Sequence, residues 1–128
     1  MKNLIEIKKK ITSEWFKSLQ NKIIDQFQLF ENEVSKKNKK KNKIFIKSTW
    51  QKKNIREGGG TSYLLSGGQL FDKVGINQST VSGQFEKNFR SKILGAEKNG
   101  KYWASGISVV AHMKNPRFQR FILTHDLL

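Results

Sequence analysis

Two histidines, His112 and His125, are the side chains of this sequence best suited to proton transfer or metal binding. A metal site needs three or four ligands, so a single histidine on a strand is more often structural than a ligand. The sequence contains no cysteine, which excludes disulfides and thiolate metal sites. His125 lies close to the C-terminal end, where chains are commonly disordered, and we interpret it as an exposed tail residue.

A serine is a further candidate for ligand binding, and a glycine-rich segment is a weaker signal. Ser108 lies within an apolar run, where a hydroxyl either contacts a ligand or satisfies a backbone group. Arg56 and Glu57 precede the glycine triplet 58–60. An arginine can hold a carboxylate through two charge-assisted hydrogen bonds, whereas a glycine triplet by itself is typical of a flexible loop. These residues alone leave the chemistry open.

The net charge of the sequence is +15, and most of the excess is lysine. A strong basic excess suits binding to nucleic acid or to an anionic surface. Arginine is the usual residue for bidentate phosphate contacts, and it occurs only at Arg56, Arg90, Arg117 and Arg120. Lysine, asparagine and isoleucine all have A/T-rich codons, so solvated lysines encoded by an A/T-rich gene are the alternative explanation.

The length of 128 residues suits a single domain. No apolar run approaches the roughly 20 residues that a membrane span needs. The basic N-terminal segment 1–11 has too short an apolar stretch for a signal peptide. We therefore expect a cytoplasmic protein, and the lack of cysteine fits a reducing compartment.

Residues 11–34 are predicted to form an amphipathic helix, capped by Thr12 and with Ile11 and Phe16 at staple spacing. An apolar stripe recurs at steps of three or four residues and is interpreted as core. Its members are Trp15, Leu19, Ile23, Phe27, Phe30 and Val34. The segment 35–43 contains six lysines in nine residues. Like charges repel, so this segment is predicted to be a solvated linker.

The rest of the sequence alternates between strand and turn signals. Strands are expected at 44–50, 63–65, 69–74, 76–82 and 102–113. Ser66-Gly67-Gly68 predicts a hairpin turn, residues 85–94 a short helix that Gly95 ends, and residues 98–101 a turn. One helix followed by sequential strands predicts an α+β fold with an antiparallel sheet.

Three stretches carry a distinctive order of residues. They are Trp50-Gln51 with Arg-Glu-Gly-Gly-Gly at 56–60; Phe-Asp-Lys-Val-Gly-Ile-Asn at 71–77 with Val-Ser-Gly at 81–83; and Gly-Ile-Ser-Val-Val-Ala-His at 106–112 with Asn-Pro at 115–116. Together they resemble the motifs of the oxygen-dependent coproporphyrinogen-III oxidases. The resemblance runs from about Trp15 to Pro116, roughly the first third of a family member. Residues 52–55 are inserted relative to the family pattern, which puts the geometry of the glycine segment in doubt.

This resemblance implies the fold and the chemistry. The implied fold is a large antiparallel sheet flanked by helices. The implied reaction is the oxidative decarboxylation of two propionate side chains of coproporphyrinogen III, giving protoporphyrinogen IX in haem biosynthesis. Molecular oxygen is the co-substrate, and no organic cofactor is needed. Ser108 matches the family's substrate-contacting serine, and His112 matches a histidine that bacterial members use for a divalent metal. Family members are homodimers, but their dimer contacts lie largely outside the matched segment.

The last residues depart from the family pattern. After Asn-Pro the family continues with Pro-Thr-x-His-x-Asn-x-Arg, which this sequence lacks. Synonymous codons for residues 118–128, read one base out of frame, restore that motif. Our hypothesis is that residues 1–116 are a partial oxidase domain and that 117–128 are an out-of-frame tail. The family's proton-donor histidine and Asn-x-Arg clamp would then be missing, and His125 would not replace them. Coding DNA that cannot be reframed to the motif would refute this.

Three interpretations stay open. The first is a truncated and inactive oxidase. The second is a small basic nucleic-acid-binding module, which the lysine-rich segment 36–43 and nearby aromatic residues support. The third is one half of a split enzyme. Against the second interpretation, no helix-turn-helix, zinc-finger or RNP pattern occurs in the sequence, so no specific nucleic-acid partner is expected.

Overall fold

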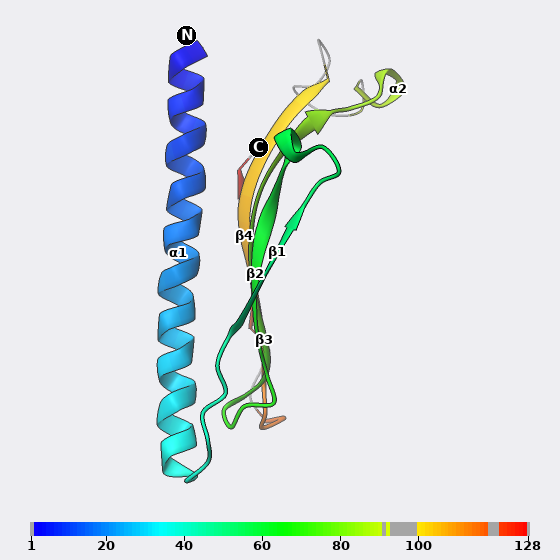
Figure 1. Cartoon of the computed structure of the whole chain (residues 1–128). Helices are drawn as coiled ribbons and strands as arrows, with labels where there is room; N and C mark the ends of the chain where they lie inside the picture. Colours follow the sequence, from blue (N-terminus) through cyan, green and yellow to red (C-terminus); the bar gives the residue numbers. More distant parts are fainter. Residues whose placement is uncertain (1, 91, 93–99, 118–120, 128) are drawn as a thin grey trace.

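The computed structural model describes residues 2–90, 92, 100–117 and 121–127, which form one long helix beside one sheet (Figure 1). The helices are α1 (Lys2–Lys37) and the short α2 (Lys87–Arg90), and a 3-10 turn, η1, spans Ile55–Glu57. The strands are β1 (Ile46–Gln51), β2 (Gly58–Ser66), β3 (Phe71–Gln84), β4 (Lys101–Met113) and β5 (Phe121–Leu127). They pair antiparallel in the order β1-β2-β3-β4-β5. The α+β class with an antiparallel sheet is thus confirmed.

Helix α1 is longer than the sequence pattern predicts, because it begins at Lys2 rather than at residue 11. The added residues contain no glycine or proline and are mostly lysine, leucine, isoleucine and glutamate, which tolerate a helix well. Thr12 therefore lies inside the helix, and its predicted role as a cap is wrong. The helix ends at Lys37, inside the predicted linker, and Lys39 follows with a φ of 54°.

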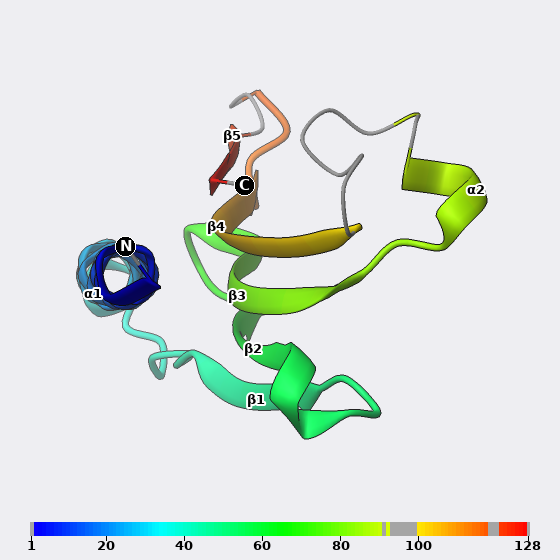
Figure 2. The same cartoon turned by 90° about the horizontal axis from the view of Figure 1, so that it is seen from above.

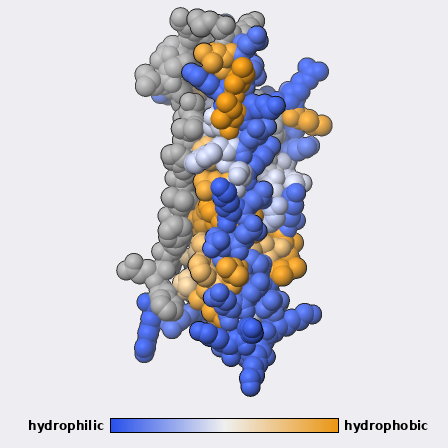
Figure 3. Space-filling view, turned by 90° about the vertical axis from the view of Figure 1, so that its left-hand side faces the viewer, coloured by the Kyte–Doolittle hydropathy of each residue, from blue (hydrophilic) through white to orange (hydrophobic). Residues whose placement is uncertain are grey.

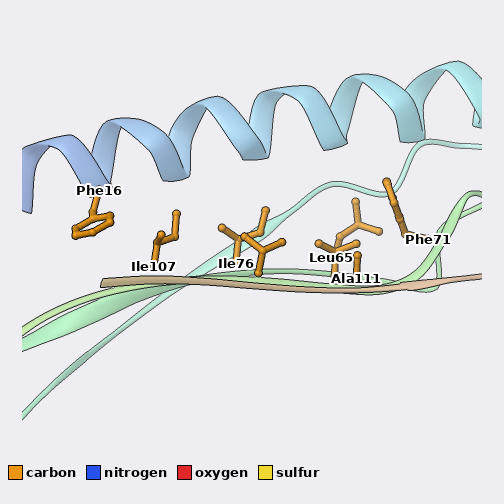
Figure 4. Close-up of a cluster of buried hydrophobic side chains, with 8 residues drawn as sticks. Phe16, Leu65, Phe71, Ile76, Ile107 and Ala111 are labelled. Carbon is orange, nitrogen blue, oxygen red and sulfur yellow. The ribbon is translucent and has the colours of Figure 1, made fainter. Parts of the chain in front are cut away.

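The helix runs along one face of the sheet (Figures 1 and 2). Figure 4 shows Phe16 pointing from α1 toward the sheet, while apolar side chains of the strands point toward the helix. The core consists of Phe16, Leu65, Phe71, Val74, Ile76, Ile107, Val109 and Ala111. Because strand side chains alternate between faces, the residues between these core positions lie on the sheet face away from α1, here called the outer face.

The predicted apolar stripe of the helix is partly wrong. Trp15 is 55% exposed and Phe30 is 46% exposed, whereas Phe16 is completely buried. Three predicted members do pack against the core, namely Leu19, Ile23 and Phe27. The buried side of α1 also includes two polar residues, Gln20 and Glu31. A stripe defined by apolar residues alone cannot include these two positions. The predicted buried side of the helix is therefore rotated about the helix axis relative to the observed one.

Gln20 replaces an apolar residue at the helix–sheet contact because it satisfies backbone groups of the sheet. Its Nε2 donates to the carbonyl oxygen of Thr61 at 2.9 Å and to that of Ile76 at 3.1 Å. A buried amide with two partners avoids the cost of an unsatisfied polar group. Gln20 therefore fixes α1 over β2 and β3.

The β2–β3 connection confirms the predicted hairpin turn. The backbone N–H of Gly67 donates to the carbonyl oxygen of Asp72 at 2.8 Å. Gly67 has a φ of 66°, which glycine adopts without the steric cost that other residues incur. The turn thus needs glycine at this position for a conformational reason.

A buried carboxylate of the helix binds this turn from the side. Glu31 has no exposed surface and accepts hydrogen bonds from the backbone N–H groups of Gln69, Leu70 and Phe71. A side chain at Gly68 would collide with the Glu31 carboxylate. Glu31 therefore connects the C-terminal half of α1 to the hairpin, and Gly68 leaves room for that contact.

Several strand boundaries differ from the predictions. The two strands expected at 69–74 and 76–82 are one continuous strand, β3, and β2 is longer than the expected 63–65. Of the expected helix 85–94, the described residues form α2, while residues 91 and 93–94, Gly95 and the first two residues of the expected turn 98–101 lie outside the described residues. Within the described ranges, no helix is both long and apolar enough to cross a bilayer.

The C-terminal segment differs from the expectation of a disordered tail. Residues 121–127 form β5, which pairs with β4 and places the backbone of His125 opposite Ile107. Within this pairing, Ser105 lies opposite Leu127 and Val109 lies opposite Leu123. An open strand edge offers unpaired N–H and C=O groups to any extended segment that follows. The reading-frame hypothesis for residues 117–128 stays a prediction, since backbone pairing does not depend on frame.

Candidate functional site

Strand β4 places Ser108 on the outer face of the sheet. Ile107 and Val109 are buried against α1, so the alternation of a strand directs Ser108 the other way. Ser108 is half-buried, and so is His112, four positions further on the same face. Both residues predicted from the sequence therefore lie on the side of the sheet that α1 does not cover.

The cross-strand register places other small polar residues in line with Ser108. Ser48 pairs with Ser62, Ser62 with Asn77, and Asn77 with Ser108. Adjacent strands are about 4.8 Å apart, so these four residues form a continuous line across β1 to β4, here called the polar row. The Asn77 Nδ2 lies 3.4 Å from the Ser108 Oγ. The polar row offers several hydrogen-bonding groups without any charge.

An apolar line runs beside the polar row. Ile46 pairs with Leu64, Leu64 with Gly75, and Gly75 with Val110. Ile46 is 70% exposed and Leu64 is 41% exposed. The outer face thus has apolar and uncharged polar groups side by side, which is the composition of a surface that binds a mostly apolar ligand with a few polar substituents.

The structure does not bring His112 together with Ser108. Four residues of strand separate them, or roughly 13 Å. His112 instead pairs across the sheet with Lys73, at an irregularity of β3. Within the described residues, no three histidine, aspartate or glutamate side chains gather as metal ligands do. A neighbouring lysine also disfavours a cation at this place, so the described residues do not by themselves fit a metal site.

The glycine triplet is part of a strand and not a flexible loop. A side chain at Gly58 would collide with the backbone of Thr80, and one at Gly59 with the backbone of Trp50. At Gly60 the added atom would come within 2.7 Å of the Trp50 indole nitrogen. Close approach of the neighbouring strands therefore explains these three glycines, and Gly58 also has a φ of 90°, which favours glycine.

The inserted residues 52–55 hold this glycine segment in place. The Lys52 Nζ donates to the Tyr102 hydroxyl at 2.8 Å and to the Ser82 carbonyl oxygen at 3.2 Å. It also lies 3.4 Å from a carboxylate oxygen of Glu57. The hydrogen bond to Tyr102 raises the pKa of Lys52 above its ordinary value. The insertion therefore adds a link between η1 and the far end of β3 and β4.

Sequence reasoning did not identify Lys52 or Tyr102, because their contact joins positions 50 residues apart. Nothing in the local pattern distinguishes Lys52 from its lysine neighbour. Arg56, which precedes the glycine triplet, is exposed and lies in η1. The structure therefore groups Ser108 with Asn77 and not with Arg56 or His112.

Two grooves lie elsewhere on the molecule. One of about 810 Å³ is lined by Lys8 and Lys9 of α1 and by Lys101 and Trp103 of β4. An entirely apolar one of about 500 Å³ lies between α1 and the sheet. Neither Ser108 nor His112 lines either groove. Ser108 therefore lies on an open face of the sheet and not in either of these two grooves.

Exposed lysines are prominent on the helix side of the molecule. Figure 3 shows hydrophilic side chains along the exposed side of α1 and around its C-terminal end. Lysines 36–43 in that region are all exposed. The polar row on the outer face consists of uncharged residues. The lysines are therefore not part of the Ser108 site.

A family model and several similar proteins match this chain, and their descriptions agree. A family model described as coproporphyrinogen III oxidase matches residues 11–124. The oxygen-dependent coproporphyrinogen-III oxidases of Rickettsia typhi and Rickettsia prowazekii are each 44% identical to the chain over 109 residues. The protein of the same name from Rickettsia bellii is 42% identical over 109 residues. Each match covers 84% of this chain, and the chain spans 38% of the length of these relatives.

Proposed function

The chain belongs to the coproporphyrinogen III oxidase family, and from this membership we propose that its outer face forms part of a binding site for coproporphyrinogen III. The substrate carries four carboxylates on pyrrole rings, so it needs apolar contact surface with a few placed polar groups. The outer face provides both. The observation that carries the proposal is the position of Ser108, beside Asn77 and between apolar residues, on the face that α1 leaves open.

We further propose the reaction of the whole protein. It is the oxygen-dependent oxidative decarboxylation of two propionate groups of coproporphyrinogen III to vinyl groups, with oxygen as the electron acceptor and no organic cofactor. The names of the relatives support this. A cytoplasmic location is part of the same proposal.

Ser108 has a binding role in this proposal. Its hydroxyl can donate a hydrogen bond to a propionate carboxylate while it accepts the one from Asn77. Charge-assisted hydrogen bonds of this kind are stronger than neutral ones. Ser108 would thereby orient one propionate against the sheet, and it would not itself take part in proton transfer.

His112 stays a predicted metal ligand of the whole protein. The described residues supply one of the three or four ligands that a metal needs. No step of the reaction is therefore assigned to a metal here. Under the reading-frame hypothesis the family's proton-donor histidine is missing, so we expect the 128-residue chain to bind the tetrapyrrole without converting it.

The test is a fluorescence titration of coproporphyrin III, the oxidised and air-stable form of the substrate, with the 128-residue chain. Ser108→Ala should weaken binding roughly fivefold to tenfold, because one hydrogen bond to a charged group is lost. Ser18→Ala removes an exposed hydroxyl from α1 and should leave binding unchanged. Equal affinity of all three proteins would refute the role of Ser108, and absence of binding would refute the site.

A further inference from the structure

Gly75 is a glycine that the fold of the described residues does not require. It lies within the 14-residue strand β3 and does not have a positive φ. A Cβ atom built on Gly75 meets nothing within 4 Å. Conformation explains Gly67 and steric contact explains Gly58, but neither reason applies to Gly75. Glycine weakens a strand interior, and its presence there often marks a place where a ligand or another backbone approaches closely.

The surroundings of Gly75 show what could approach it. Leu64 and Val110 are its partners on the two neighbouring strands. Asn77 is the next residue of β3 on the same face, and its amide lies 3.4 Å from the Ser108 hydroxyl. The bare backbone of Gly75 is therefore a flat area between two apolar side chains, with an uncharged hydrogen-bonding pair along one border.

We infer that Gly75 and Asn77 are specificity-determining residues of the tetrapyrrole site, an inference that rests on the function proposed above. Gly75 leaves room for a pyrrole ring to lie directly on the backbone of β3. Asn77 donates a hydrogen bond from its carboxamide to the propionate of that ring, next to the one that Ser108 donates. An amide nitrogen carries two N–H groups, so Asn77 can keep its contact with Ser108 while it binds the carboxylate.

The experiment compares stability and binding of the same variants. Coproporphyrin III fluorescence is titrated with the 128-residue chain and with Gly75→Ala and Asn77→Ala, and thermal unfolding of each protein is recorded. Gly75→Ala should keep or raise the unfolding midpoint. The added methyl group enters open space, and alanine lowers the conformational entropy of the unfolded chain. It should nevertheless weaken porphyrin binding at least fivefold. Asn77→Ala should weaken binding about fivefold at an unchanged midpoint.

Neither substitution changes the net charge, so non-specific attraction of the porphyrin to the lysines is the same in all proteins. Ser66→Ala, at an exposed position near the end of β2, is the control for a small change on the same face. If the unaltered chain binds and both variants bind equally well, the inference is overturned while the proposed function stands. If the unaltered chain does not bind, both fail. A lowered unfolding midpoint of Gly75→Ala also overturns the inference, because the fold itself would then require the glycine.

Discussion

The Glu31 carboxylate closes the β2–β3 hairpin through three backbone N–H groups while it has no exposed surface. Glu31→Gln replaces one oxygen with an NH₂ group that cannot accept these hydrogen bonds. We expect the free energy of unfolding to fall by about 1–3 kcal/mol, the usual cost of an unsatisfied buried polar group. Denaturant unfolding at pH 7 measures this. Glu33→Gln, at an exposed position of the same helix, is the matched control. Equal stability of both variants would contradict the role of Glu31.

Lys52 gives a prediction with a pH dependence. Its pKa is raised above the ordinary value of 10.5, first by the hydrogen bond to Tyr102. A raised pKa means that the protonated form stabilises the fold, so the contribution is full below the ordinary value and disappears as the pH rises through the raised one. Lys52→Met should therefore unfold at a lower temperature than the unaltered chain at pH 8, and the difference should disappear as the pH rises through the raised pKa.

Two controls separate this effect from a general loss of charge. Lys53→Met removes the exposed neighbouring lysine and should not reproduce the pH-dependent difference. In a Tyr102→Phe background the effect of Lys52→Met should shrink, because the main cause of the raised pKa is absent. A difference that persists unchanged at high pH would contradict this explanation.

At the scale of single residues, the sequence predicted positions better than contacts. The turn at Gly67 follows from glycine chemistry, and the strand around Ser108 follows from its apolar neighbours. The roles of Glu31 and Lys52 depend on partners about 40 and 50 residues away. Such contacts have no local signal, so they could not be predicted. The register that brings Asn77 to Ser108 is equally non-local.

At the scale of elements, two adjacent residues of α1 test which side of the helix packs. Phe16 is completely buried, and its neighbour Trp15 is 55% exposed. Phe16→Ala should lower the free energy of unfolding by about 3–5 kcal/mol, through lost burial and the cavity left behind. Trp15→Ala should cost far less, although the ring also touches Phe16. Chemical denaturation of both variants measures the difference, and a larger loss in Trp15→Ala would favour the originally predicted stripe.

Element types were easier to predict than element ends. The helix, the hairpin and the long strand β4 all follow from periodicity and turn residues. The start of α1 was missed because Thr12 was interpreted as the residue that caps the helix, although residues 2–10 tolerate a helix. The predicted division of β3 into strands 69–74 and 76–82 was also wrong, and Gly75 lies between these two ranges. The structure continues the strand through it.

At the scale of the whole molecule, strand β1 is an exposed edge of the sheet. All six of its residues are exposed, and Ile46 is 70% exposed. An exposed edge with apolar side chains favours pairing with another chain, whereas the net charge of +15 opposes it. We expect the chain to associate increasingly as salt screens the charge. Light scattering after size-exclusion chromatography at low and high salt measures this.

Ile46→Lys should suppress the association, because a charge on the edge strand blocks edge-to-edge pairing. Ile55→Lys is the matched control, since Ile55 is 71% exposed but lies in η1 and not in a strand. Both variants add the same charge. If both suppress association equally, repulsion alone explains the result and the β1 edge is not the contact.

The arrangement of α1 against the sheet has a consequence for protein synthesis. The helix is made first, yet the residues that cover its apolar side lie in β2, β3 and β4, the last of them at Ala111. At roughly 5–20 residues per second, a ribosome needs on the order of 5–20 seconds to proceed from Phe16 to Ala111. During this time the nascent helix has no sheet to pack against. A chaperone that recognises apolar segments would therefore meet α1 first, and slower translation between β1 and β4 would lengthen that encounter.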